Sequence, residues 1–69
     1  MIFVYRKDVD FKVLTLDESL KQESVLFESG YKHISTIDSE IMIKNIYEIV
    51  LGKGSSTEKL VKIEENLLK

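Results

Sequence analysis

His33 is the only histidine of this 69-residue chain, and its side chain is the one best suited to acid–base chemistry near neutral pH. A Ser-His-Asp set can be imagined with a serine of the chain and with Asp17 or Asp38, but a nucleophile-elbow sequence would place that serine on a sharp glycine-containing turn after a strand. The chain has no cysteine and no glycine-rich turn of that kind. We therefore expect His33 to be a structural or surface residue, and the protein to be no enzyme.

Residues 52–57, with the sequence GKGSST, contain the residue types of a phosphate-binding loop. That motif follows a strand and places its lysine after the second glycine, directly before Ser or Thr. Here Lys53 precedes the second glycine, and the segment follows a predicted helix. We expect a plain connection between two helices, with only incidental anion binding at the start of the second one.

Asp8 and Asp10 share a predicted loop and could contact a divalent cation only loosely. Calcium loops supply more oxygen ligands and a glycine at the bend. Zinc sites need thiolates or several histidines, and this chain has no cysteine and a single histidine. We therefore predict no metal site and no cofactor.

Glu64 lies near the middle of the apolar arc of the last predicted helix, an arc that spans about 160°. Its carboxylate must reach water or pair with a base, because an unpaired charge is costly to desolvate. Lys44 on the preceding helix is one candidate base. Two interpretations remain open: Glu64 lies at the rim between two smaller contacts, or it is a charge that selects the partner in an interface.

Three segments have the β-branched and aromatic composition of strands, namely residues 2–6, 11–16 and 31–37. Residues 7–10 are polar and suit a hairpin connection, and because they contain no glycine we expect a loop longer than a two-residue turn. The first strand has the most continuous apolar run. This places it at the centre of the sheet, antiparallel to both neighbours, with direct pairing of the second and third strands as the alternative.

Thr15 and Glu18 form a capping box that predicts the start of a first helix, with Asp17 as the competing N-cap. Gly30 supplies the left-handed residue that stops this helix at about residue 29. The predicted inward stripe of the helix consists of Leu16, Leu20 and Phe27, with Ser24 alongside.

Residues 38–52 predict a second helix, capped by Asp38. Its apolar arc covers about 200°, twice the stripe of a one-sided surface helix, so it must be covered from two directions. A third helix over residues 56–68 begins with a second capping box, formed by Ser55 and Glu58.

These elements predict one small α+β domain over residues 1–69, with the order ββαβαα and a three-stranded, mainly antiparallel sheet packed against helices. A domain of this size is only marginally stable, and the chain has no cysteine with which to form a disulfide. Both faces of the first two strands are apolar, so the sheet needs cover on both sides. The three helices could supply that cover, or a second copy of the chain could.

The apolar surplus indicates a non-enzymatic protein–protein interaction module, with a homodimer as the first expectation and another protein as the alternative partner. We expect the interface to use the second and third helices or the open sheet face, with Lys44 and Glu64 setting its specificity. Val25 and Leu26 are either scattered exposed residues or a further contact patch. The predicted contact residues are Ile43, Tyr47, Val50, Leu60, Ile63, Leu67 and Leu68.

Ten basic and twelve acidic residues give a net charge of −2 and alternate along the chain, so nucleic-acid binding is disfavoured. The alternative function is a regulator that binds nucleic acid through a composite basic surface of a dimer. The N-terminus has an apolar run of only five residues with no basic region before it, unlike a signal peptide or a membrane span. We therefore expect a cytoplasmic protein without membrane contact. The lysines of the alternative basic surface are Lys44, Lys53, Lys59 and Lys62.

Overall fold

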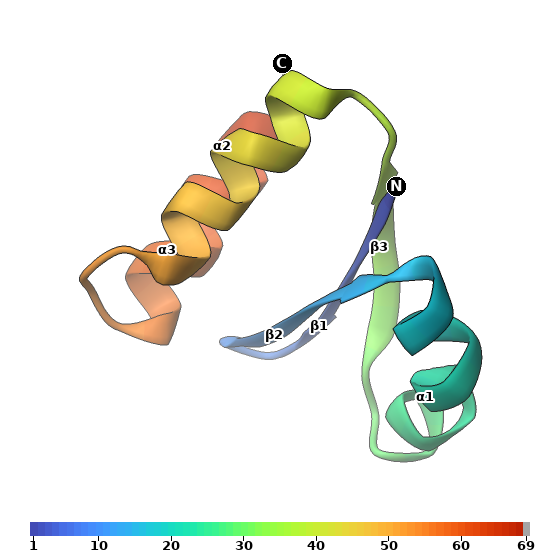
Figure 1. Ribbon diagram of the computed structural model, residues 1–69. Helices are drawn as coiled ribbons and strands as arrows, with labels where there is room; N and C mark the ends of the chain where they lie inside the picture. Colours follow the sequence, from blue (N-terminus) through green and yellow to red (C-terminus); the bar gives the residue numbers. More distant parts are fainter. Residues whose placement is uncertain (69) are drawn as a thin grey trace.

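Six secondary-structure elements follow one another in the computed structural model, which describes residues 1–68. Their order is ββαβαα, as the sequence patterns predict, and each boundary lies within two residues of the expected one. The elements are β1 (Ile2–Lys7), β2 (Asp10–Thr15), α1 (Leu16–Glu28), β3 (Lys32–Ile37), α2 (Glu40–Leu51) and α3 (Ser56–Leu67) (Figure 1).

The three strands form one open sheet in which β1 is central and pairs antiparallel with both β2 and β3. This order confirms the predicted arrangement, and the alternative in which β2 pairs with β3 is wrong. Val4 pairs with Ser35 and Tyr5 pairs with His33, so the register changes between the two pairs. Ile34 is therefore an extra residue on β3, which makes a β-bulge in this strand.

A two-residue turn, Asp8 and Val9, joins β1 to β2, because Lys7 and Asp10 are the last paired residues of the hairpin. The expectation of a longer loop is wrong. Asp8 adopts the left-handed conformation with a φ of 53°, which aspartate tolerates better than most side chains, so the turn forms without a glycine. The Nε atom of Arg6 donates a hydrogen bond of 2.7 Å to the Asp8 carbonyl oxygen and holds the turn.

Helices cover both faces of the sheet, with α1 on one side and the α2–α3 pair on the other (Figure 1). Side chains of β1 alternate between the two cores that result. Ile2 and Val4 are buried in the larger core, with Ile46 of α2 and Ile63 of α3. The smaller core, on the α1 side, consists of Tyr5, Leu14 and Leu26. The cover that both sheet faces need is therefore supplied within one chain.

Helix α1 begins and ends as predicted but turns a different face toward the sheet. The Thr15 side chain accepts from the Glu18 N–H, and the Glu18 carboxylate accepts from the Thr15 N–H, which completes the capping box. Gly30 follows the helix with a φ of 95°. The buried residues of α1 are Ser19 and Leu26. The expected inward stripe is instead exposed, at 47% for Leu16, 76% for Leu20 and 47% for Phe27.

The hydroxyl group of Tyr5 explains this rotation of α1. The Tyr5 side chain is fully buried, and its hydroxyl shares a hydrogen bond with Oγ of Ser19 and donates another of 3.0 Å to Oε2 of Glu23. A buried hydroxyl without a partner is costly, so the helix presents its polar side to Tyr5. The stripe of Leu16, Leu20 and Phe27 is thereby turned toward the surface.

Helix α2 is capped by Ser39 and not by Asp38, because Oγ of Ser39 accepts the hydrogen bond from the Met42 N–H. Ser39 directly precedes the first helical residue, the position from which a side chain reaches the free N–H groups of the first turn. Asp38 lies one residue too far upstream. Ser55 is the N-cap of α3, as predicted, since its Oγ accepts from the Glu58 N–H. The predicted capping box is incomplete, because the Glu58 carboxylate does not accept a hydrogen bond from the Ser55 N–H.

Candidate interaction surface

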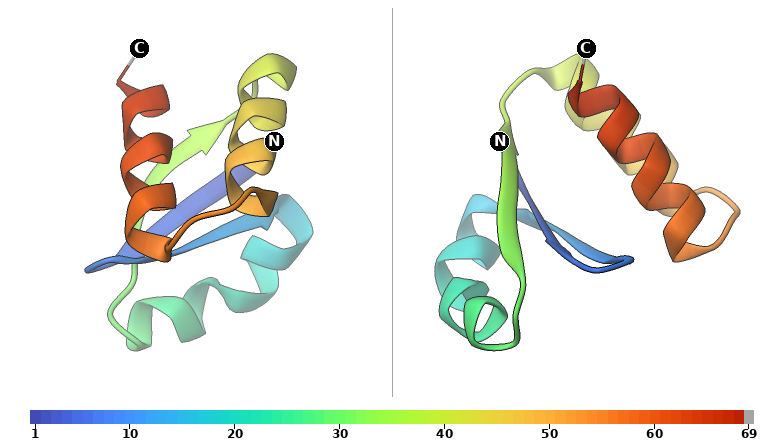
Figure 2. Two further views of the ribbon diagram at one scale, coloured as in Figure 1. Left: turned by 90° about the vertical axis from the view of Figure 1, so that its left-hand side faces the viewer. Right: turned by 180° about the vertical axis from the view of Figure 1, so that it is seen from behind.

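β3 is an edge strand whose outer side is uncovered. Helices α1 and α3 both pack against β2 at the opposite edge, whereas β3 contacts mainly β1. No other element of residues 1–68 lies in front of β3 when the molecule is seen from behind (Figure 2, right). Backbone N–H and C=O groups on such an edge can pair with another strand. The exposed side chains of β3 are Lys32, His33, Ile34 and Thr36.

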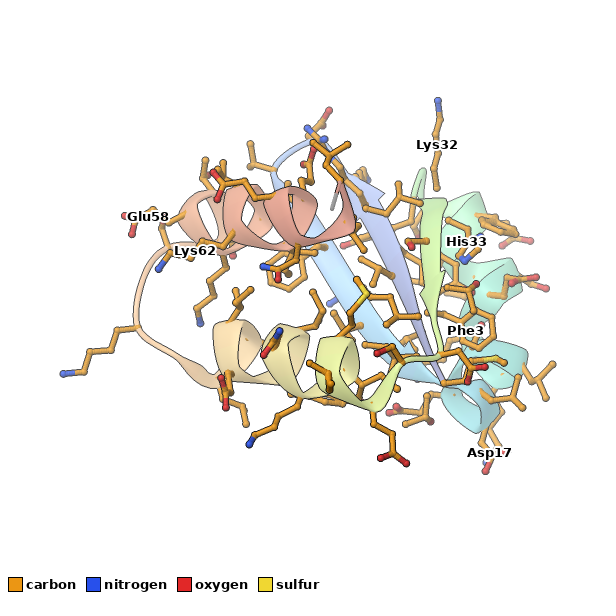
Figure 3. All side chains as sticks on the ribbon, turned by 90° about the horizontal axis from the view of Figure 1, so that it is seen from above. Phe3, Asp17, Lys32, His33, Glu58 and Lys62 are labelled. Carbon is orange, nitrogen blue, oxygen red and sulfur yellow. The ribbon has the colours of Figure 1, made fainter. Side chains whose placement is uncertain are left out.

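Aromatic rings lie on the face of β3 that adjoins α1. The centroid of the His33 ring is 5.9 Å from that of Phe3 and 5.4 Å from that of Tyr5. The Phe27 ring of α1 is 6.0 Å from the Tyr5 ring. Figure 3 shows Phe3 and His33 between the sheet and α1. Tyr5 is buried, so the accessible part of this cluster, the aromatic flank, consists of Phe3, Phe27 and His33.

A pocket of about 310 Å³, which we call the α3 pocket, adjoins β3 on the sheet face that lies away from α1, at the C-terminal end of α3. Ile34 and Leu68 give it apolar walls and are 39% and 88% exposed. A second pocket, of about 400 Å³, shares Arg6 and Ile34 with the first and adds the cations of Lys7 and Lys32. The α3 pocket is lined by Arg6, Ile34, Ser35, Glu64, Leu67 and Leu68.

Glu64 pairs with Arg6 at the α3 pocket. The Nη1 atom of Arg6 donates to Oε1 of Glu64 at 2.7 Å, which joins β1 to α3 across 58 positions of sequence. The base is therefore Arg6 and not Lys44, which is exposed on α2. The side chains of Arg6 and Glu64 are 41% and 40% exposed, so the ion pair is in contact with water.

Glu64→Gln is expected to lower the free energy of unfolding by less than about 1 kcal/mol, because a half-exposed ion pair contributes little. Glutamine keeps the shape and one acceptor for Arg6. Chemical denaturation at low and high salt measures the effect, which should shrink as mobile ions screen the pair. Glu65→Gln on the exposed side of α3 is the matched control. A loss of several kcal/mol that salt does not change would contradict the assignment of a surface pair.

The seven predicted contact residues fall into three groups. Leu60 and Ile63 are 3% and 0% exposed and are buried within the single chain, so neither is accessible to a partner. Leu68 is exposed and lines the α3 pocket with Leu67 and Glu64. The residues that pack partly against the larger core are Ile43, Tyr47, Val50 and Leu67. Of these seven, the structure places Leu67 and Leu68 beside the open edge, together with Glu64, which was predicted to set the specificity.

His33 lies beside one hydroxyl group, but no acidic side chain among residues 1–68 accepts a hydrogen bond from its ring, so no third group orients it as a base. Its Nε2 atom lies 2.8 Å from Oγ1 of Thr36, which is its only side-chain hydrogen bond within residues 1–68. Over the same residues no cluster of three or more His, Cys, Asp or Glu side chains is arranged to hold a metal ion. None of the helices described has the length and apolar content needed to cross a lipid bilayer.

The open β3 edge is the feature that the sequence patterns did not single out. Two signals point to it: the predicted strand order makes the third strand an edge, and residues 32–36 contain one apolar side chain, Ile34. Val25 and Leu26 do not form a shared patch, because Leu26 is buried whereas Val25 is 63% exposed.

Comparison of the chain with models of protein families, with curated proteins and with solved structures found no match. Within residues 1–68, the surface around β3 is the clearest candidate site.

Proposed function

We propose that this protein is a non-enzymatic, cytoplasmic protein–protein interaction module that self-associates along the β3 edge. The observation that carries the proposal is an uncovered strand edge with apolar side chains on both of its faces. The aromatic flank borders the edge beside α1, and Ile34, Leu67 and Leu68 border it beside α3. Proteins normally cover or charge such an edge, because it is a template for pairing with another chain.

Strand addition would use both parts of this surface. The backbone of β3 would supply hydrogen bonds to an added strand, and the flanking side chains would supply apolar contact. Burial of one exposed leucine contributes about 1.5–3 kcal/mol before the costs of association. The bulge at Ile34 and the charge of Lys32 oppose pairing along the first half of β3, so an added strand would pair with residues 35–37.

Leu68→Ser is expected to weaken self-association by about tenfold, whereas Leu51→Ser should leave it unchanged. The two leucines are a matched pair, 88% and 84% exposed at the C-terminal ends of α3 and α2. Only Leu68 lines the α3 pocket, so only its loss removes apolar area from the proposed contact. Sedimentation equilibrium from low micromolar to submillimolar concentration gives the dissociation constant of each variant.

The wild-type chain should form a dimer whose population rises with concentration. A wild type that stays monomeric over the whole range would rule out self-association and leave the surface for a different protein. If both serine variants dimerised like the wild type, or if both were weakened equally, the α3 pocket would not be part of the contact.

The nucleic-acid regulator has less support from the geometry. The Nζ atom of Lys59 donates to the Val50 carbonyl oxygen at 2.9 Å, which holds this cation against the end of α2. Lys53 and Lys62 share a pocket of about 330 Å³ between α2 and α3 with the carboxylate of Glu48. An acidic group among the lysines reduces the positive potential that phosphate binding needs.

A further inference from the structure

We propose that the pocket at the start of β3 binds a small anion that carries a phosphate group. This inference goes beyond the proposed function and does not depend on self-association. The pocket has a volume of about 400 Å³, and among the six residues that line it three are cationic and one is acidic. We call it the cation pocket, and its lining residues are Arg6, Lys7, Asp8, Gly30, Lys32 and Ile34.

Two of these cations face each other across neighbouring strands. Arg6 of β1 and Lys32 of β3 are partners in the sheet register, so their side chains lie on the same face. Like charges directly opposite each other are unfavourable in a sheet. The Glu64 carboxylate binds Arg6 at 2.7 Å, whereas Lys32 forms no ion pair within residues 1–68. An anion between the two strands would remove the repulsion that remains.

Lys7 adds a third cation, which its neighbours hold in place without a carboxylate. Its side chain lies across Gly30, since a Cβ atom on that glycine would be 3.4 Å from Cε and 3.8 Å from Nζ of Lys7. The Nζ atom lies 6.0 Å from the centroid of the Tyr31 ring. Asp10, the strand partner of Lys7, instead accepts a hydrogen bond of 2.6 Å from the Tyr31 hydroxyl. Within residues 1–68 the Lys7 ammonium group therefore has no ion-pair partner.

The cation pocket lies around the end of the sheet, so side chains from both faces of β1 reach it. Arg6 and Lys7 are consecutive and point to opposite faces, but Arg6 is the last residue of β1 that pairs with β3. Beyond that residue β3 does not separate Lys7 from the pocket. The Lys32 side chain extends away from the sheet and the helices in Figure 3, so its flexible stem is free to turn toward a bound anion.

A phosphate group fits these donors better than a carboxylate or a nucleic-acid strand does. At neutral pH a phosphate monoester carries a charge of about −1.5 to −2 and three acceptor oxygens, so it can contact three cations at once. A carboxylate carries one charge and two oxygens. A nucleic-acid strand needs a row of contacts along a basic surface, which a chain with a net charge of −2 and alternating charges does not offer.

Inorganic phosphate is the probe that tests the site. It should bind saturably in the millimolar range or below, and the amide NMR signals that shift should be those of residues 6–8 and 30–34. Lys7→Gln and Lys32→Gln should each weaken binding by about tenfold, because each removes one charged donor. Lys12→Gln is the matched control and should leave the affinity unchanged, since Lys12 is an exposed lysine on β2, the other edge strand.

Asp8→Asn should have the opposite effect and tighten phosphate binding by about threefold. It removes the charge of the one acidic residue that lines the cation pocket. Asparagine tolerates the left-handed conformation that Asp8 adopts, so the turn is kept. A change that merely disturbed the turn would weaken binding instead.

Thermal melting separates an anion site from a structural role of Lys32. Without phosphate, Lys32→Gln should melt at the wild-type temperature or slightly above it, because the variant lacks the repulsion with Arg6. Phosphate at about ten times its dissociation constant should raise the Tm of the wild type by about 6 to 11 °C relative to chloride at the same ionic strength. At that same phosphate concentration the Tm of Lys32→Gln should rise by about a third as much.

The possible outcomes are distinct. Absence of saturable phosphate binding would overturn the proposal, as would equal weakening by Lys12→Gln or acetate that binds as tightly as phosphate. A short oligonucleotide that binds more tightly than inorganic phosphate and depends on the same lysines would replace the small anion by nucleic acid. Weaker binding in the Lys7 and Lys32 variants together with tighter binding in Asp8→Asn supports the site. A wild type that stays monomeric would contradict the proposed self-association and leave these results unaffected.

Discussion

Ile63→Ala is expected to lower the free energy of unfolding by about 2 to 5 kcal/mol. The Ile63 side chain is 0% exposed and lies in the larger core, where β1 meets α2 and α3. Its truncation leaves a cavity whose lining loses both apolar burial and packing contacts. The total stability of a domain of 69 residues is about 3 to 10 kcal/mol, so this one change should remove a large share of the stability.

Val61→Ala is the matched control for Ile63→Ala. Val61 lies on the same helix and is also β-branched, but it is 51% exposed, so its truncation should change the stability by less than about 0.5 kcal/mol. Urea denaturation followed by circular dichroism gives both values from the midpoints. Equal losses for the two variants would contradict the placement of Ile63 in the core.

Protein concentration provides the second readout for Ile63. The cavity lies within one chain, so the loss of stability relative to wild type should persist at concentrations where the protein is monomeric. A side chain buried only by a partner would instead affect the dissociation constant and leave the monomer unchanged. This distinguishes the core position seen in the structure from the interface position that the helical pattern predicts for Leu60 and Ile63.

Local patterns were sufficient for the elements and the strand order. The capping box of Thr15 and Glu18, the glycine after α1 and the apolar run of β1 depend on neighbours in sequence or on the period of a strand. The turn at Asp8 differs from the expected loop because aspartate can replace glycine at a left-handed position when a neighbouring side chain holds the turn. The composition of the turn does not show that the Arg6 side chain holds it.

Contacts between distant residues decided the rest. The side of α1 that faces the sheet depends on the Tyr5 hydroxyl, which lies 14 positions from its partner Ser19. The base that pairs with Glu64 is Arg6, which lies at the other end of the chain. A helical wheel contains no information on either contact. The predicted inward stripe of α1 therefore followed apolar periodicity, and the choice of Lys44 as the base for Glu64 followed proximity in sequence.

The candidate surface was predictable only in part, because burial of the helix faces depends on how the helices pack. The broad apolar arcs of α2 and α3 are largely covered within one chain, since both helices pack on the sheet and on each other. The case for a partner therefore depends less on the total apolar area than on the β3 edge. Glu64, Leu67 and Leu68 belong to the site because the end of α3 reaches that edge.

Tyr5→Phe is expected to lower the free energy of unfolding by about 1 to 3 kcal/mol, although it removes one oxygen atom and no apolar area. Ser19 is 3% exposed, so its hydroxyl would lose its partner in a place that water does not reach. Glu23 would also lose the hydrogen bond that it accepts from Tyr5. Tyr31→Phe is the matched control, because the Tyr31 hydroxyl donates to Asp10 at an exposed position.

Ser19→Ala tests whether the effect of Tyr5→Phe comes from this contact. Alone it leaves the Tyr5 hydroxyl with Glu23 as its remaining partner and should cost stability. In the double variant no hydroxyl is left without a partner at this contact, so the loss should be smaller than the sum of the two single losses. Additive losses would contradict the view that the hydrogen bond determines which side of α1 faces the sheet.

The pH dependence of stability gives an independent readout of the same group. Burial raises the pKa of Tyr5 above its ordinary value of 10.0, and the Glu23 carboxylate adds to the shift, while the hydrogen bond with Ser19 opposes it. Because the folded chain keeps the proton longer than the unfolded chain, this contribution to stability is complete below pH 10 and is lost as the pH rises through the folded-state pKa. Denaturation midpoints of the wild type should therefore fall more steeply above pH 10 than those of Tyr5→Phe, which lacks the titrating group. If the midpoints of the two proteins fell equally steeply with pH above 10, Tyr5 would ionise in the folded chain as it does in the unfolded chain. That result would contradict the assignment of the buried Tyr5 hydroxyl as the group that orients α1.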